Sequence, residues 1–166
     1  KEENCKMVLL ACNTTSSTIY DDLRKWVESE FPERLLFGVV RPTVEYLKDK
    51  DSIVFFGTRR TVMSHAYKNA FPDAQNVFEI AMPELATMIE NGDDTLKYIS
   101  LFKELIPKDI KTGALVCTHY GIVKDEFKQI FPQITEWVLQ EEIIPEKFKN
   151  YFMEKSERED SLSKGS

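Results

Sequence analysis

The chain has 166 residues, of which 42% are hydrophobic and 30% charged, a composition typical of a soluble domain. Its net charge of −6 argues against nucleic acid as the main partner. No apolar run approaches the roughly 20 residues that span a bilayer, so we expect no membrane segment. Three cysteines cannot all be paired in disulfides, which favours reduced thiols and a cytoplasmic location.

Strand-like and helix-like segments alternate along the chain. Short apolar, β-branched or aromatic runs predict strands at 6–11, 35–40, 52–56, 76–81, 113–117 and 134–139. Amphipathic spacing predicts helices at 19–30, 61–70, 84–90, 95–105, 123–131 and 146–154. Such βα units predict an α/β fold with a mostly parallel sheet covered by helices.

Prolines mark the expected joints between the parts of the chain. Pro42 follows the second predicted strand, and another proline closes the segment that holds the last cysteine. We therefore expect residues 42–132 to form one lobe, and residues 1–41 to be part of another. Residues 133–154 are expected to return to the lobe of residues 1–41, and the polar tail 155–166 is expected to fray.

Two short stretches read as variants of one unit. Residues 8–15 are Val-Leu-Leu-Ala-Cys-Asn-Thr-Thr, and residues 114–120 are Ala-Leu-Val-Cys-Thr-His-Tyr. Each is an apolar run that ends at a cysteine, before polar residues and a helix-like stretch. Function in α/β folds lies at the carboxyl ends of strands, and a helix start favours a thiolate. We therefore interpret Cys12 and Cys117 as functional, although a single buried cysteine is more often a small hydrophobe.

Two opposed thiols suit one chemistry, the transfer of an α-proton between the two faces of an amino acid. One base cannot easily serve both faces, so a group is needed on either side. Helix dipoles and polar neighbours can tune a cysteine toward this task. The sequence contains no P-loop, paired CxxC site or GxGxxG motif, and no lysine in a context that suggests pyridoxal phosphate. We therefore expect neither a cofactor nor a metal.

The polar residues near the cysteines have both a structural and a functional interpretation. Asn13 and Thr14 are placed to cap the following helix, and Thr118 has the same position after the second cysteine. Thr58 and Thr61 lie in a strand-to-helix turn, whose N–H groups suit either helix capping or a bound carboxylate.

The two histidines differ in context. His119 lies two residues after Cys117, where it can orient or protonate that thiol; the alternative is a partly buried histidine with a structural role. His65 has no comparable neighbours, and we expect it at the surface or in the core. Cys5 is not followed by polar residues like those after the other two cysteines, so we assign it to packing or to the surface.

The residues around the two cysteines resemble those of glutamate racemases, in the aspartate/glutamate racemase superfamily. The pairing of Ala11-Cys12-Asn13-Thr14 with Cys117-Thr118-His119-Tyr120 is specific, because either tetrapeptide alone would be weak. Further similarity lies at residues 37–42, 57–62, 82–92 and 140–152. Family members are longer and open with an Asp-Ser-Gly-x-Gly-Gly motif that this sequence does not contain. The resemblance therefore predicts a racemase that lacks its amino-terminal part.

The resemblance implies a fold, an activity and a set of site residues. The fold would be one racemase lobe plus part of a second, pseudo-symmetric lobe. The activity would be cofactor-independent interconversion of L- and D-glutamate, the small-molecule substrate, for bacterial peptidoglycan. Family members are often dimers, so a homodimer is one expected arrangement. The implied catalytic residues are Cys12, Cys117 and His119, and the implied substrate-binding residues are Asn13, Thr14, Thr58, Thr61 and Thr118.

Three alternatives stay open at this point. The same mechanism would serve aspartate or another acidic amino acid. A shortened relative would keep the fold as a binding module without catalysis, which the missing Asp-Ser motif favours. A thiol-redox role is disfavoured, because the two cysteines are far apart in the sequence and have no CxxC context.

Overall fold

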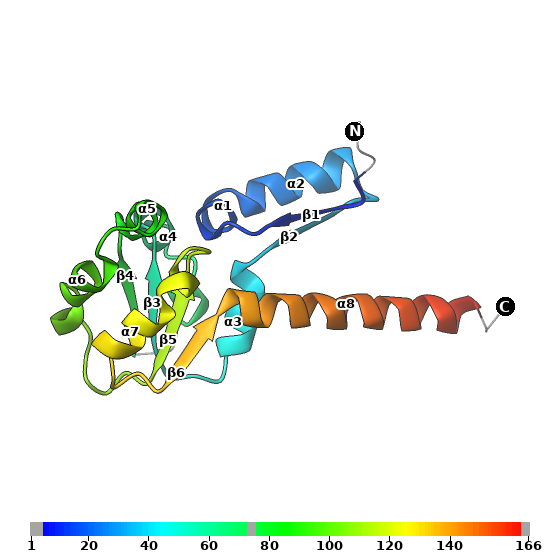
Figure 1. The fold of residues 1–166 in the computed structure, drawn as a ribbon. Helices are drawn as coiled ribbons and strands as arrows, with labels where there is room; N and C mark the ends of the chain where they lie inside the picture. The colour runs from blue at the N-terminus through cyan, green and yellow to red at the C-terminus, as the bar shows by residue number, and fades with distance from the viewer. Residues whose placement is uncertain (1–4, 73–75, 164–166) are drawn as a thin grey trace.

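The strands form two sheets, and the strands within each sheet are parallel (Figure 1). The computed structural model describes residues 5–72 and 76–163, with side chains as far as Met153. The smaller sheet pairs β1 (Met7–Leu10) with β2 (Leu35–Gly38). The larger sheet has the order β4-β3-β5-β6, with β3 at Ser52–Gly57, β4 at Asn76–Ala81, β5 at Thr112–Val116 and β6 at Glu136–Leu139. The predicted α/β class with parallel strands is confirmed.

All six predicted strands are present, with ends that differ from the prediction by at most two residues. The two central strands of the larger sheet are buried almost throughout: every residue of β5, and every residue of β3 after Ser52. Strands covered by helices on both faces have near-continuous apolar runs. This burial explains why the strands were easy to locate in the sequence.

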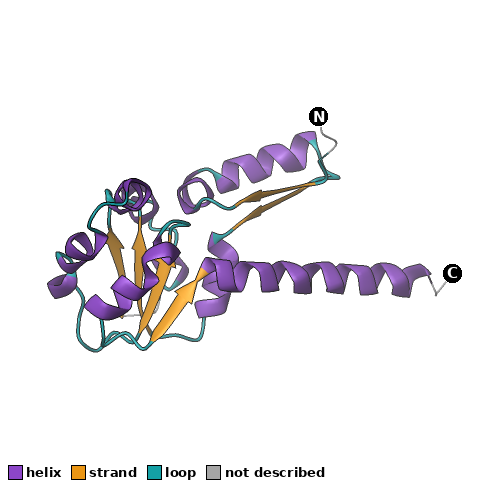
Figure 2. Cartoon of the chain, in the orientation of Figure 1, coloured by secondary structure: helices purple, strands orange, loops and turns teal. Residues whose placement is uncertain are grey.

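The helices flank the strands and connect them (Figure 2). They are α1 (Asn13–Thr18), α2 (Tyr20–Glu30), α3 (Val40–Leu47), α4 (Arg59–Met63), α5 (Leu85–Asn91), α6 (Thr95–Ser100), α7 (Lys124–Ile130) and α8 (Gln140–Ser163). In the described part of the chain, three short 3₁₀ turns follow or precede them: η1 (Lys68–Ala70), η2 (Lys103–Leu105) and η3 (Tyr120–Val123). Among the described residues, none of the helices is both long and apolar enough to cross a membrane.

Two helices, α1 and α3, lie outside the predicted helix ranges, and three of the predicted helices differ from their expected bounds. The helix expected at 61–70 ends at Met63, because His65 has a φ of 51° that α-helical backbone does not allow. The helix expected at 95–105 is divided into α6 and η2. The last helix begins six residues earlier than expected and continues to Ser163, past the predicted end at residue 154.

Two cores lie on opposite faces of the larger sheet, because successive strand residues point to opposite sides. Phe56 belongs to the core that the sheet shares with α5, α6 and α7, together with Leu115 and Phe127. The neighbouring Phe55 belongs to the other core, which includes Ile143 of α8. The sheet is therefore covered on both faces, and its carboxyl-terminal edge is left for the site.

The smaller sheet forms a separate layer with α1 and α2, and α8 passes beneath it in Figure 1. Aromatic contacts join the layer to α8, since Phe37 of β2 lies 5.0 Å from Phe148 and 5.1 Å from Tyr151, ring centre to ring centre. Strand β6, by contrast, pairs with β5. The larger sheet therefore extends to residue 139, beyond the boundary at 132 that the prolines suggested. Within residues 133–154, the aromatic contacts with the smaller sheet come from α8.

Candidate functional site

One strand of the smaller sheet and two strands of the larger sheet end close together and bring the predicted residues to one place. Cys12 follows β1, Thr58 follows β3 and Cys117 follows β5. The two sheets meet here, because the hydroxyl oxygen of Thr14 lies 2.8 Å from that of Thr58 and 3.3 Å from that of Thr61. The negative charge of Cys12 also acts on the pKa of Cys117, so the two sulfur atoms belong to one electrostatic site. This is the edge at which α/β proteins bind their ligands.

Cys12 caps the amino terminus of α1, and its carbonyl oxygen accepts the N–H of Ser16 at 2.9 Å. The side chain is exposed. Its partial burial acts to raise the pKa of the thiol, but the N–H and hydroxyl groups of Thr15 and Thr14 outweigh this and lower the pKa. Because these groups donate more strongly to a charged sulfur than to a neutral thiol, they bias Cys12 toward the thiolate.

Cys117 has the opposite bias. The residue is only 9% exposed, and burial raises the pKa of its thiol. The N–H groups of His119 and Tyr120 act against burial, whereas the charge of Cys12 adds to it. The site therefore pairs a thiol that ionises readily with one that holds its proton.

His119 connects Cys117 to a carboxylate that sequence analysis did not find. Its Nδ1 atom lies 3.9 Å from the sulfur of Cys117 and 3.5 Å from the hydroxyl of Thr118. Its Nε2 atom lies 2.7 Å from a carboxylate oxygen of Glu90, in α5. A carboxylate only accepts, so Nε2 carries a hydrogen and donates it to Glu90. Glu90 gave no signal in the sequence because it is one carboxylate in an amphipathic helix, 29 residues from its partner.

The threonines form a hydroxyl cluster at the start of α4. Thr58 is the capping residue of this helix, and its hydroxyl accepts the N–H of Thr61 at 3.3 Å. The two hydroxyl oxygens are 3.0 Å apart, and Thr14 of α1 completes the cluster. The structural interpretation as helix caps is thus confirmed for Thr58, while substrate binding by these threonines stays a prediction.

Asn13 differs from its neighbours because its side chain is occupied inside the protein. The residue is 2% exposed, and it forms hydrogen bonds with Gln140 and Tyr67. Neither partner was found from the sequence, since they lie 127 and 54 residues away. Among the described residues, no group of three histidine, cysteine or carboxylate side chains is placed to hold a metal ion.

No protein-family model matches the chain, but sequences and structures of known proteins do. The glutamate racemase of Fusobacterium nucleatum is 34% identical over 139 residues, which cover 77% of this chain and 50% of that protein. The glutamate racemase of Lactobacillus acidophilus is 31% identical over 135 residues, with the same two shares.

A solved structure agrees with these relatives. The crystal structure of glutamate racemase from Thermus thermophilus in complex with β-chloro-D-alanine matches with a TM-score of 0.79 and 26% identity. The match covers 93% of this chain and 59% of that one. The chain spans about half the length of the curated relatives that it matches. Over the part that it shares with them, the chain is a homologue of the glutamate racemases, as its two cysteine motifs predicted.

Proposed function

We propose that this chain carries the two-cysteine centre of a glutamate racemase, which interconverts L- and D-glutamate without a cofactor. The observation that carries the proposal is the pair of thiols at the ends of β1 and β5, with pKa shifts of opposite direction. The racemases that the chain matches support glutamate as the substrate. Such an enzyme would act in the cytoplasm and supply D-glutamate for peptidoglycan.

The opposite pKa shifts suit a resting state with one base and one acid. The Cys12 thiolate takes the α-proton from one face of the amino acid, and the electron pair of the broken C–H bond stays on the carbon. The Cys117 thiol then gives its proton to the other face. The reaction leaves Cys12 as a thiol and Cys117 as a thiolate, the state that is needed for the opposite direction.

His119 and Glu90 would assist at Cys117. With its Nε2 hydrogen donated to Glu90, the neutral imidazole presents the Nδ1 lone pair toward the thiol of Cys117 and orients its S–H group. Glu90 therefore acts through His119, as a positioning residue.

The substrate would be held by the polar groups that surround the two sulfur atoms. Glutamate carries two carboxylates, and hydroxyl and N–H groups at helix starts bind carboxylates. Thr14, Thr58 and Thr61 offer such groups between the two sheets, and Thr118 offers a hydroxyl beside His119. Aspartate or another acidic amino acid would use the same groups, so the substrate assay must include both.

A second candidate function is a binding module that lacks catalysis. The observation in its favour is the hydroxyl cluster of Thr14, Thr58 and Thr61, which can hold a carboxylate without the help of either thiol. Such a module would bind glutamate through the same hydroxyl groups and would not exchange the α-proton.

A racemisation assay that starts from L-glutamate or from D-glutamate, monitored by circular dichroism, distinguishes the two functions. We expect activity in both directions, and a loss of at least about 10²-fold in Cys12→Ser and in Cys117→Ser, the range of a lost acid or base. Cys5→Ser is the matched control, because Cys5 is an exposed thiol that donates to the carbonyl oxygen of Met7. Binding of glutamate by calorimetry without racemisation would contradict the enzyme and support the module.

A further inference from the structure

A network of buried polar side chains includes Asn13, the residue that directly follows Cys12. The side-chain oxygen of Asn13 accepts hydrogen bonds from the hydroxyl of Tyr67 and from the side-chain N–H of Gln140. The side-chain N–H of Asn13 donates to the side-chain oxygen of Gln140. The Gln140 amide also lies 2.9 Å from the hydroxyl of Thr43 and 3.1 Å from that of Tyr67. All four residues are buried. The network joins the start of α1 to α3, to the segment after α4 and to the start of α8.

Buried polar groups are costly unless they are paired, so such a network specifies one arrangement. Here it specifies the orientation of Asn13, which is the first residue of α1 and follows Cys12 directly. The next two residues, Thr14 and Thr15, supply the N–H and hydroxyl groups that act on the Cys12 sulfur. Fixing Asn13 therefore fixes the turn whose donors surround the thiolate.

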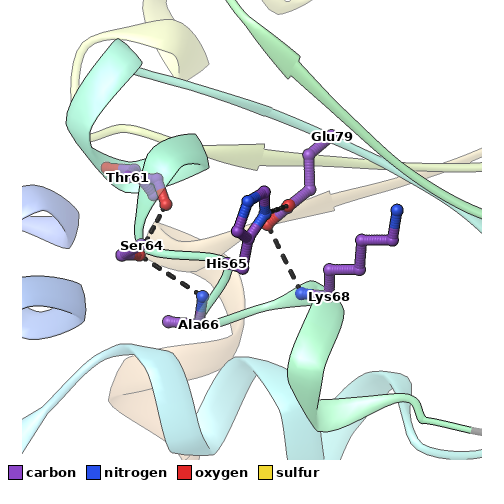
Figure 3. A network of polar contacts seen from close by, with 6 residues as sticks. All are labelled: Thr61, Ser64, His65, Ala66, Lys68 and Glu79. Atoms are coloured by element: carbon purple, nitrogen blue, oxygen red, sulfur yellow. Dashed lines mark hydrogen bonds and ion pairs between the residues drawn. The ribbon is translucent and has the colours of Figure 1, made fainter.

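The segment that delivers Tyr67 to this network is itself held in an unusual conformation (Figure 3). His65 has a φ of 51°, which residues other than glycine rarely adopt. A carboxylate oxygen of Glu79 lies 2.8 Å from its Nδ1 atom, and the other accepts the N–H of Lys68 at 3.4 Å. Ser64 donates to the carbonyl oxygen of Thr61 at 2.6 Å. These contacts end α4 and turn the chain so that the Tyr67 ring lies in the core against Phe55.

We propose that Tyr67 and Gln140 are positioning residues for Cys12 that act through Asn13. The inference rests on the proposed function, because it explains how one of the two thiols is kept in its reactive setting. It also changes the role expected for Asn13: the side chain serves the protein rather than the substrate. The substrate would then meet the main chain of Asn13 and the hydroxyl groups of the neighbouring threonines.

Alkylation of Cys12 tests the proposal without requiring racemisation. Tyr67→Phe and Gln140→Met remove hydrogen bonds from the network with little change in volume. The rate at which iodoacetamide modifies the Cys12 peptide is measured against pH by mass spectrometry. We expect the midpoint to move to higher pH and the rate at pH 7 to fall about fivefold, the equivalent of one lost hydrogen bond. Thr95→Val is the matched control, because Thr95 is buried and donates to Glu126 at 2.6 Å.

The outcomes separate positioning from stability alone. Variants that melt earlier, as we expect of Thr95→Val, but keep the Cys12 profile of the unchanged chain would overturn the proposal. Thr43→Val, which removes one acceptor of Gln140 and the hydrogen bond from Thr43 to the carbonyl oxygen of Val39, serves if a stronger variant does not fold. In the racemisation assay we expect kcat to fall with little change in KM, because the network does not touch the substrate. A shifted Cys12 profile in a chain without racemase activity would keep the positioning role and reject the proposed function.

Discussion

At the scale of single residues, the two thiols differ because their surroundings differ. Cys12 is exposed at the start of α1, where the donors of Thr15 and Thr14 overcome the effect of burial on its pKa. Cys117 is buried at the end of β5, and burial keeps its pKa high. If the two thiols had equal pKa values, nothing in the site would decide which of them carries the proton. Here the fold decides it, because it shifts the two pKa values in opposite directions.

The pH dependence of kcat/KM follows from these shifts. Activity should rise with pH as Cys12 ionises, below the ordinary pKa of a thiol, and fall as Cys117 ionises, above it. The profile is therefore expected to be bell-shaped. Thr15→Ala should move only the acid limb to higher pH, because it removes a donor to the Cys12 thiolate. Thr18→Ala, whose hydroxyl donates to the carbonyl oxygen of Thr14, is the control.

Movement of the alkaline limb in Thr15→Ala, with the acid limb unchanged, would reverse the assignment of the two cysteines. An acid limb that is the same in Thr15→Ala and Thr18→Ala would remove the threonine donors from the account. Both readings come from one series of initial rates, measured across the same buffers at constant ionic strength.

The pairing of Glu90 with His119 gives a second prediction at this scale. Glu90→Gln keeps the length of the side chain but removes the charge that holds the Nε2 hydrogen. We expect kcat to fall about tenfold, the lower range for loss of a group that orients a catalytic histidine. His119→Ala should cost more, about 10²-fold, because the assisting group itself is lost.

Steady-state kinetics of both variants test this prediction. Glu84→Gln is the control, because Glu84 is an exposed carboxylate. Equal activity in Glu90→Gln and Glu84→Gln would show that the Glu90 contact has no part in the reaction.

At the scale of elements, the strands were readable from the sequence because burial on both faces leaves a local apolar pattern. The end of α4 was not readable. It depends on His65 and on a carboxylate of β4 that lies 14 residues further along the chain. The site shows the same division: the cysteines and threonines stand at strand ends, which a pattern reveals. Glu90, Tyr67 and Gln140 join it through contacts that only the folded chain creates.

Close packing between β5 and β6 leads to a prediction about stability. A methyl group added at Gly113 would lie 2.8 Å from the Trp137 ring, which is held by Phe56 and Phe127. Gly113→Ala should therefore lower the free energy of unfolding by about 2 kcal/mol through overpacking. Gly92→Ala provides the comparison, since its methyl group has open space but its φ is 73°. We expect a loss of about 1 kcal/mol there.

Urea denaturation, monitored by tryptophan fluorescence, measures the free energy of unfolding of both variants. A Gly113→Ala variant as stable as the unchanged chain would mean that the β5–β6 contact is looser than the structure shows.

At the scale of the whole molecule, the site lies where the two sheets meet. A two-stranded sheet is marginal by itself, so the smaller sheet depends on its contacts with α8 and on the hydroxyl cluster that reaches α4. The relation between the two cysteines is therefore a property of the whole chain, although each motif is local. A homodimer stays a prediction, which sedimentation velocity would test.

The fate of the α-hydrogen in D₂O tests the two-thiol centre most directly. Starting from L-glutamate, a two-base exchange predicts that newly formed D-glutamate carries solvent deuterium at the α-carbon, while the remaining L-glutamate keeps its hydrogen at first. Starting from D-glutamate, the pattern should be mirrored. Proton NMR and mass spectrometry of early time points provide the measurement. Product that retains the substrate hydrogen would indicate a single base and contradict the account, as would the absence of exchange from either enantiomer.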